Sequence, residues 1–319
     1  MAMSPAQQED LRLSCTEYWK EAFNEGPHTS FTMIELMRSL SRISYTDLLQ
    51  KRKLKLLHGV TNLDRSPYDM AWAYRTGRCT SFAIKVARRL ENDHPEQFCF
   101  RYYDLGAHRI ARCDITGIVI DSESVTGARY LTENEGWDLT PENGSRGRLK
   151  YVASPRGHSK FQEKSGDARR NKLKTVSINP ISPRKALEIC LRQAAERISL
   201  VCAFRSIEYT VDSPAGWVTR FHSTIKWRIT HRRIELTPYF YRPQEIFSIT
   251  FGRGDLATNR NCIRNFVAFV RARGIEEQWK ADGIDEINKD LWKAAVKVWG
   301  YPTWTQEILP PEQIPGSVR

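Results

Sequence analysis

The sequence predicts an α+β protein, in which helices precede and follow separate groups of antiparallel strands. Three observations support this prediction. Apolar residues recur at helical spacing within residues 5–57 and again in 79–91. Short runs with alternating apolar residues follow in 98–121, and longer ones in 199–241. Helical periodicity returns near the end of the chain, within 259–299.

The first 65 residues form the expected N-terminal helical part (1–65). Ser4 and Pro5 suit an N-cap and the first position of a helix, because the serine oxygen accepts from free backbone N–H groups and proline needs no helical donor there. Apolar residues continue this helix, namely Leu11, Leu13, Tyr18, Trp19 and Phe23. Similar patterns predict two further helices, at Phe31–Leu40 and Tyr45–Leu57.

Residues 66–149 form the expected core. A helix-like segment, SPYDMAWAYRTG, leads into Gly77 and Cys79. Cys79 begins a second helical pattern, whose apolar face includes Phe82, Val86 and Leu90. The residues NDHP at 92–95 predict the end of this helix.

Three strands are expected after this helix. The first alternates through Phe98, Phe100 and Tyr102. His108 begins the second strand and Asp121 closes the third. Because residues two apart point to the same side of a strand, the groups that share a face are His108, Ile110 and Arg112, and then Ile115, Gly117, Val119 and Asp121.

A cysteine, a histidine and an aspartate in this order fit the chemistry of a cysteine nucleophile. The reactive form of cysteine is the thiolate, which a helix N-terminus stabilises through its free N–H groups and its dipole. A nearby imidazole takes the thiol proton, and a carboxylate orients the imidazole and stabilises its charged form. We therefore predict that Cys79 is the nucleophile, His108 its base and Asp121 the residue that orients the base.

The residues around this predicted triad resemble the catalytic core of transglutaminase-like (papain-like) cysteine enzymes. The matching positions are Gly77, Cys79, Phe82, Ala83, Ala107, His108, Ile120, Asp121 and Ser122. Arylamine N-acetyltransferases are a related branch with the same order of Cys, His and Asp. The resemblance covers roughly residues 66–125 and implies a cysteine core with a helical N-terminal part and an antiparallel sheet.

Two departures from the family pattern leave the acyl donor open. The acetyltransferase branch usually has a doubled glycine and an aromatic residue around its cysteine, whereas this chain has Thr76, Gly77 and Arg78. Transglutaminase-like cores commonly have an aromatic residue after the histidine, whereas this chain has Arg109 and Ile110.

Three residues near the nucleophile are predicted to bind substrate. Trp72 and Tyr74 lie in the segment before Cys79, where an N–H or O–H would support the negative oxygen that forms during acyl transfer. Arg78 would lower the pKa of the thiol or bind an anionic substrate. The simpler alternatives are that Trp72 belongs to an apolar helix face and that Arg78 is an exposed, solubilising residue.

A basic stretch follows the predicted core. The chain carries a net charge of +12, and much of the excess lies in 150–174, which is rich in Lys and Arg and shows little periodicity. We predict a basic loop or linker over 150–181. Nucleic acid would bind only through the 150–174 stretch, which would otherwise attract an acidic partner or an anionic cofactor such as coenzyme A. A solvated tether is the simpler alternative.

Residues 182–319 are predicted to form a mixed extension of strands and helices that packs on the core. Ser182 and Pro183 begin a helix that continues to Ile198. Alternating runs then predict strands over 199–211, 217–230 and 232–241. We expect the second and third of these strands to pair as an antiparallel hairpin. Two final helices are expected at Asn259–Arg273 and Asp285–Trp299.

The composition excludes several classes of protein. At 319 residues, 40% of them hydrophobic, the chain can bury a full core. No apolar run is long enough to cross a membrane, and the N-terminus lacks the pattern of a secretory signal. Seven irregularly spaced cysteines favour a reducing compartment over a disulfide framework, so we expect a cytoplasmic protein. No Cys or His pair has zinc-binding spacing.

Together these features predict cysteine-dependent acyl transfer to an amine through a Cys79 acyl-enzyme, which is a thioester. The acyl donor and the acceptor would be small molecules or peptides, and no cofactor is required. Two alternatives stay open. One is a cysteine hydrolase of the same fold, such as a protease, amidase or deamidase. The other is a non-catalytic basic binding module on a degenerate transglutaminase-like scaffold.

Overall fold

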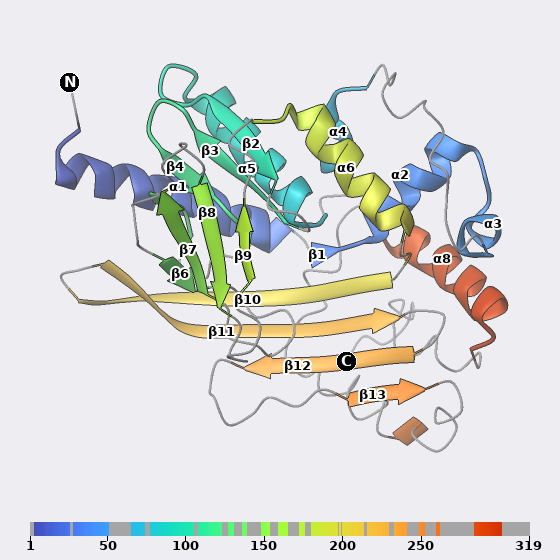
Figure 1. Ribbon diagram of the computed structural model, residues 1–319. Coiled ribbons are helices and arrows are strands. Elements are labelled where there is room, and N and C mark those ends of the chain that lie inside the picture. The colour runs from blue at the N-terminus through green and yellow to red at the C-terminus, as the bar shows by residue number, and fades with distance from the viewer. Residues whose placement is uncertain are drawn as a thin grey trace, which may run out of the picture.

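The protein combines helices with three antiparallel sheets, which confirms the predicted α+β class (Figure 1). This computed structural model describes residues 3–25, 28–50, 65–73, 77–104, 108–122, 127–130, 136–138, 148–153, 159–164, 172–175, 180–196, 198, 200–213, 216–229, 233–240, 249–252, 260–261 and 284–301. Within these residues, no helix has both the length and the apolar character needed to cross a membrane.

The helices begin and end close to the positions that the sequence predicts. Their bounds are α1 Pro5–Glu25, α2 Phe31–Ser41, α3 Tyr45–Gln50, α4 Pro67–Ala71, α5 Cys79–Asp93, α6 Pro183–Glu196 and α8 Ile284–Trp299. Ser4 caps α1 reciprocally with Gln7, because the N–H of each residue donates to the side chain of the other, at 2.9 and 3.3 Å. The helices expected over 51–57 and within 262–273 lie outside the described residues.

The sheet that carries the predicted histidine and aspartate has four strands in the order β2-β3-β4-β5. Their bounds are β2 Phe100–Asp104, β3 Arg109–Cys113, β4 Ile118–Ile120 and β5 Arg129–Tyr130. All neighbours in this sheet are antiparallel, and β3 pairs with β4 through Ala111–Ile120 and Arg112–Val119. His108 directly precedes β3 and Asp121 directly follows β4, so the two residues lie at the same end of adjacent strands.

A second sheet has the order β1-β10-β11-β12-β13, and its long strands lie side by side in Figure 1. The bounds are β1 His28–Thr29, β10 Leu200–Ser213, β11 Gly216–Ile229, β12 Arg233–Phe240 and β13 Ile249–Gly252. The predicted pairing of the second and third strands of this region is confirmed, because β11 and β12 are antiparallel from Ser223–Phe240 to Ile229–Ile234.

The third sheet differs from the sequence prediction. Its order is β6-β7-β8-β9, with bounds β6 Gly136–Asp138, β7 Arg148–Ala153, β8 Ser159–Lys164 and β9 Lys172–Thr175. Three of these strands lie within or overlap the stretch that the sequence predicts as a basic loop or linker over 150–181. The prediction of loop structure is therefore wrong for these strands. In β8 and β9 only Phe161 and Leu173 are apolar, so neither strand has an alternating pattern in its sequence.

One hydrophobic core joins elements from both ends of the chain. Its buried residues come from α1 to α6, from β2, β3 and β4, and from α8. Helix α5 lies at the centre of this packing and contacts α1, α4, α6 and β3. In α1, Trp19 is fully buried and meets Phe82 of α5 edge to face, with the ring centroids 5.8 Å apart.

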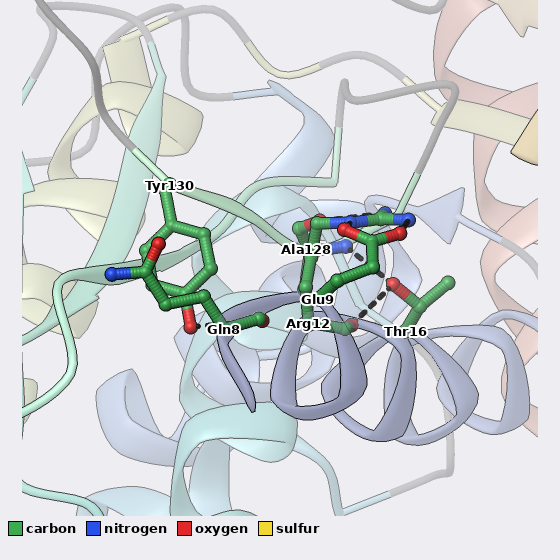
Figure 2. Close-up of polar contacts among 6 residues, drawn as sticks. All are labelled: Gln8, Glu9, Arg12, Thr16, Ala128 and Tyr130. Carbon is green, nitrogen blue, oxygen red and sulfur yellow. Dashed lines mark hydrogen bonds and ion pairs between the residues drawn. The ribbon is translucent and has the colours of Figure 1, made fainter. Parts of the chain in front are cut away.

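Helix α1 is also attached to β5 by polar contacts, which Figure 2 shows. Thr16 Oγ1 donates to the carbonyl of Arg12 at 2.8 Å and accepts from the N–H of Ala128 at 3.2 Å. The hydroxyl of Tyr130 donates to the carbonyl of Gln8 at 3.1 Å. These contacts fix the sheet edge next to β4 against the first helix.

Candidate functional site

Cys79 is the first residue of α5, as the sequence predicts. The preceding residue, Arg78, is the N-cap and has extended backbone angles, with φ −94° and ψ −178°. The Arg78 carbonyl accepts the first helical hydrogen bond, from the N–H of Phe82 at 2.9 Å. The Cys79 thiol therefore belongs to the first turn of α5, at the positive end of the helix dipole, which favours a thiolate. Cys79 is buried, with 9% of its surface exposed.

Gly77 allows the chain to approach α5 closely before the helix begins. A Cβ at this position would lie 2.2 Å from the Cβ of Ser81 and 3.3 Å from the carbonyl oxygen of Ala71. The Gly77 carbonyl also accepts from the N–H of Thr29 at 3.1 Å, which attaches this segment to β1. A residue with a side chain at position 77 would push the first turn of α5 out of place.

His108 and Asp121 form a close, buried pair. Nε2 of His108 lies 2.6 Å from Oδ1 of Asp121, and the exposed fractions of the two residues are 8% and 1%. Arg112 and Val119 are cross-strand partners, and His108 and Asp121 are an even number of residues from them. The two side chains therefore point to the same side of the strands, which allows them to meet diagonally.

The pair defines what each ring nitrogen of His108 can do. An N–H at Nε2 donates to the ionised Asp121, so Nδ1 carries the lone pair in the neutral imidazole. Nδ1 is then the atom that would accept a proton, and the carboxylate would stabilise the imidazolium that forms. This arrangement fits a general base that is held in one tautomer.

A buried arginine joins the region of the histidine to the region of the cysteine. Arg109 follows His108, and its Nη1 donates to Oγ1 of Thr80, the residue after Cys79, at 3.4 Å. Both terminal nitrogens of Arg109 donate to Oε1 of Gln193 on α6, at 3.2 and 3.1 Å. Thus the first turn of α5 and the start of β3 meet through neighbours of the two predicted catalytic residues.

Trp19 and Gln193 also belong to this region, although the sequence does not predict it. The indole N–H of Trp19 donates to the carbonyl oxygen of Asp121 at 2.8 Å. Gln193 lies 84 positions after its partner Arg109. No local pattern relates residues at such separations, so the sequence of one chain holds no signal for either contact. In the sequence, Arg109 is recognisable only as a departure from a family pattern.

A second thiol lies near Cys79. Cys190 is on α6, one turn before Gln193, and is buried. Burial raises the pKa of the Cys190 thiol, and the charge of Cys79 raises it further, while Arg78 and Arg109 oppose these effects. The Cys190 thiol therefore stays protonated more readily than an ordinary cysteine.

The residues predicted to bind substrate have different outcomes. The indole N–H of Trp72 donates to Oε2 of Glu25 at 2.7 Å, which attaches Trp72 to α1. Arg78 is half-buried at the N-cap of α5. Tyr74 lies outside the described residues. Substrate binding by these three residues stays a prediction. Within the described part of the chain, no three His, Cys, Asp or Glu residues are grouped to hold a metal ion.

Comparisons with known proteins add one distant similarity. No protein-family model matches the chain, and no curated protein matches it. Among solved structures, the chain is similar to the arylamine N-acetyltransferase from Mycobacterium abscessus, with 14% sequence identity and a TM-score of 0.35. The match covers 92% of this chain and 99% of that one. A TM-score of this size carries no argument about function.

Proposed function

We propose that the protein catalyses cysteine-dependent acyl transfer, with Cys79 as the nucleophile of a transglutaminase-like core. The observation that carries this proposal is the buried pair of His108 and Asp121, with 2.6 Å between Nε2 and Oδ1. The contact between Thr80 and Arg109 supports it, because these residues are the immediate neighbours of Cys79 and His108. The position of Cys79 at the start of α5 supplies the remaining element.

The first half of the reaction forms the acyl-enzyme. His108 Nδ1 accepts the proton of the Cys79 thiol, and Asp121 stabilises the imidazolium. The Cys79 sulfur attacks the carbonyl carbon of a thioester, ester or amide donor. The N–H of Cys79 at the helix N-terminus supports the oxyanion. When the tetrahedral intermediate collapses, the bond to the leaving group breaks and that group takes the proton from His108.

The second half returns the enzyme to its starting state. An amine acceptor loses a proton to His108 as its nitrogen attacks the thioester carbonyl. The carbon–sulfur bond then breaks, and Cys79 recovers the proton from His108. Water in place of the amine would give hydrolysis through the same intermediate. The acyl group and the acceptor are therefore to be identified by a direct screen.

The first test measures the rate at which iodoacetamide alkylates Cys79 as a function of pH, with detection by intact mass and peptide mapping. The exposed Cys99 serves as the reference thiol in the same molecule. We expect selective labelling of Cys79 at pH values between about 6 and 7, below the ordinary thiol pKa of about 8.5. His108→Ala is expected to slow this reaction by about 100-fold, and Asp121→Asn to slow it less.

Two outcomes separate the alternatives. Labelling of Cys79 no faster than Cys99, with no response to His108→Ala, would reject the catalytic proposal and favour a binding module. Fast labelling justifies a screen of thioester and ester donors, in which the acyl-enzyme appears as an added mass on Cys79. Cys79→Ser controls for acylation elsewhere. Release of that mass by amines but not by water distinguishes transfer from hydrolysis.

A further inference from the structure

Arg109 is a charged side chain in a place where the fold would normally accept an apolar one. It precedes the buried residues Ile110 and Ala111 on β3, and only 1% of its surface is exposed. A buried guanidinium loses its hydration, and hydrogen bonds and opposite charge recover only part of that free energy. An apolar side chain of similar volume would often stabilise such a site as well or better. Packing alone therefore does not explain an arginine here.

The contacts of Arg109 connect three elements around the first turn of α5. Thr80 lies on α5, Gln193 on α6 and Asp104 on β2, directly across from Arg109 in the antiparallel ladder. Oδ1 of Asp104 lies 3.4 Å from Nη2 of Arg109. Because the guanidinium is planar and its N–H groups have fixed directions, the binding of Gln193 by two nitrogens fixes its orientation.

We propose that Arg109 is a positioning residue for Cys79: its guanidinium holds the first turn of α5 against α6 and places a fixed positive charge beside that turn. This inference rests on the proposed function. The positive charge would favour the thiolate of Cys79, and the contact with Thr80 would fix the direction of the sulfur. Arg109 is not proposed to contact the substrate.

The influence of Arg109 on a thiol is visible at Cys190. Burial raises the pKa of Cys190, while the charges of Arg78 and Arg109 act in the opposite direction. Cys190 lies one turn before Gln193 on α6, so the guanidinium lies close enough to act on the Cys190 thiol electrostatically. The other charged and titratable groups of this region are Arg78, Asp104, His108, Arg109, Asp121 and Cys190.

The experiment compares variants of the full chain by the pH profile of Cys79 alkylation with iodoacetamide. Arg109→Met removes the charge and the hydrogen bonds, and Arg109→Lys retains the charge but loses the two-nitrogen contact with Gln193. In Arg109→Met we expect the midpoint of the pH profile of Cys79 alkylation to rise by about one pH unit or more. Labelling of Cys79 near pH 6.5 then slows about 10-fold. Arg109→Lys should retain the midpoint and lower the limiting rate at high pH. Arg101→Met, which removes an exposed arginine from β2, should change neither value.

A role in stability alone predicts a different result. Arg109→Met would then unfold more easily in urea, while the midpoint and the limiting rate for Cys79 stayed at the wild-type values, and this would overturn the inference. If Arg109→Met does not fold, Arg109→Lys and Thr80→Val test the inference instead. Thr80→Val removes the hydroxyl that Arg109 contacts and keeps the shape of the side chain. Wild-type limiting rates in both variants would overturn the inference. If Cys79 of the wild type is labelled no faster than Cys99, the result would instead reject the proposed function itself.

Discussion

The indole nitrogen of Trp19 donates a hydrogen bond to the main-chain carbonyl of Asp121 at a distance of 2.8 Å. Trp19 is fully buried, and 102 positions separate the two residues. The same side chain packs on Phe82, which lies in the first turns of α5. The first helix thus fixes both the backbone of the residue that holds His108 and the helix that begins at Cys79.

Trp19→Phe should destabilise the protein and slow the alkylation of Cys79. The substitution leaves the carbonyl of Asp121 buried without its donor, which costs about 1–3 kcal/mol in the free energy of unfolding, in addition to lost packing. Trp292→Phe is the matched control, because Trp292 is 1% exposed and its indole nitrogen has no hydrogen-bond partner within the described residues. Urea denaturation of both variants measures the difference. Equal losses would show that the hydrogen bond contributes nothing.

Gly77→Ala should lower the stability and displace the start of α5. The new Cβ would lie 2.2 Å from the Cβ of Ser81, and overpacking of this kind costs about 1–3 kcal/mol. Ser81→Gly removes the opposing Cβ, whereas Ser81→Ala retains it. A double-mutant cycle in urea should therefore show rescue of Gly77→Ala by Ser81→Gly alone. Rescue by Ser81→Ala as well would contradict the proposed clash.

Gly127→Ala is expected to be much more destabilising than Gly117→Ala. Both glycines have positive φ, at +81° and +75°, so each substitution carries the left-handed backbone cost of about 1–2 kcal/mol. Only at Gly127 would the new Cβ also meet a side chain, with Cγ2 of Thr16 at 2.3 Å; at Gly117 the nearest atom is 3.9 Å away. Thermal unfolding of the two variants measures the extra cost. Similar melting temperatures would rule out the close approach of Thr16.

Glu35 should contribute stability that depends on pH. Burial raises the pKa of Glu35, but hydrogen bonds from Arg38 and Tyr45 outweigh this effect, so its pKa lies below the ordinary value. A depressed pKa means that the contribution is present above the unfolded-state pKa of about 4.3 and is lost as the pH falls below it.

The variant Glu35→Gln should accordingly melt at a lower temperature than the wild type at pH 7 and at a similar temperature near pH 3. Asp290→Asn is the control, because Asp290 forms an i,i+3 pair with Lys293 in which the side chains are 67% and 57% exposed. Exposed pairs of this kind contribute little, so Asp290→Asn should have almost no effect. A gap between wild type and Glu35→Gln that stayed constant with pH would argue against an ionised Glu35 as its source.

The parts of the fold that could be predicted are those whose signal is local. The beginning of α1 at Pro5, of α5 at Cys79 and of α6 at Pro183 follow from capping residues and helical periodicity. The antiparallel order of β2, β3 and β4 follows from alternation and short turns. In β8 and β9 a single apolar residue stands among charged and polar ones, so the sequence predicts a loop where the structure has strands.

In the predicted site, too, contacts between residues near in sequence could be predicted and contacts between distant residues could not. His108 and Asp121 directly flank neighbouring strands that a short turn joins, so strand register alone could suggest that they meet. The contacts of Trp19 with Asp121 and of Gln193 with Arg109 cross 102 and 84 positions. Such contacts depend on how whole elements pack. In the sequence, Trp19 has the spacing of an apolar helix face and Gln193 that of an exposed helix surface.

The contacts of Arg109 also set the order in which the region can be completed during synthesis. A ribosome delivers α1 and α5 before β3, so Trp19, Thr80 and Arg109 are available early in the nascent chain. Gln193 emerges only after α6 has been translated. Until then the guanidinium lacks its acceptor on α6, and the first turn of α5 lacks the helix against which it is held. A nascent chain that stops before α6 would therefore carry Cys79, His108 and Asp121 without the contact between Arg109 and Gln193, so this region is completed only once α6 has been made.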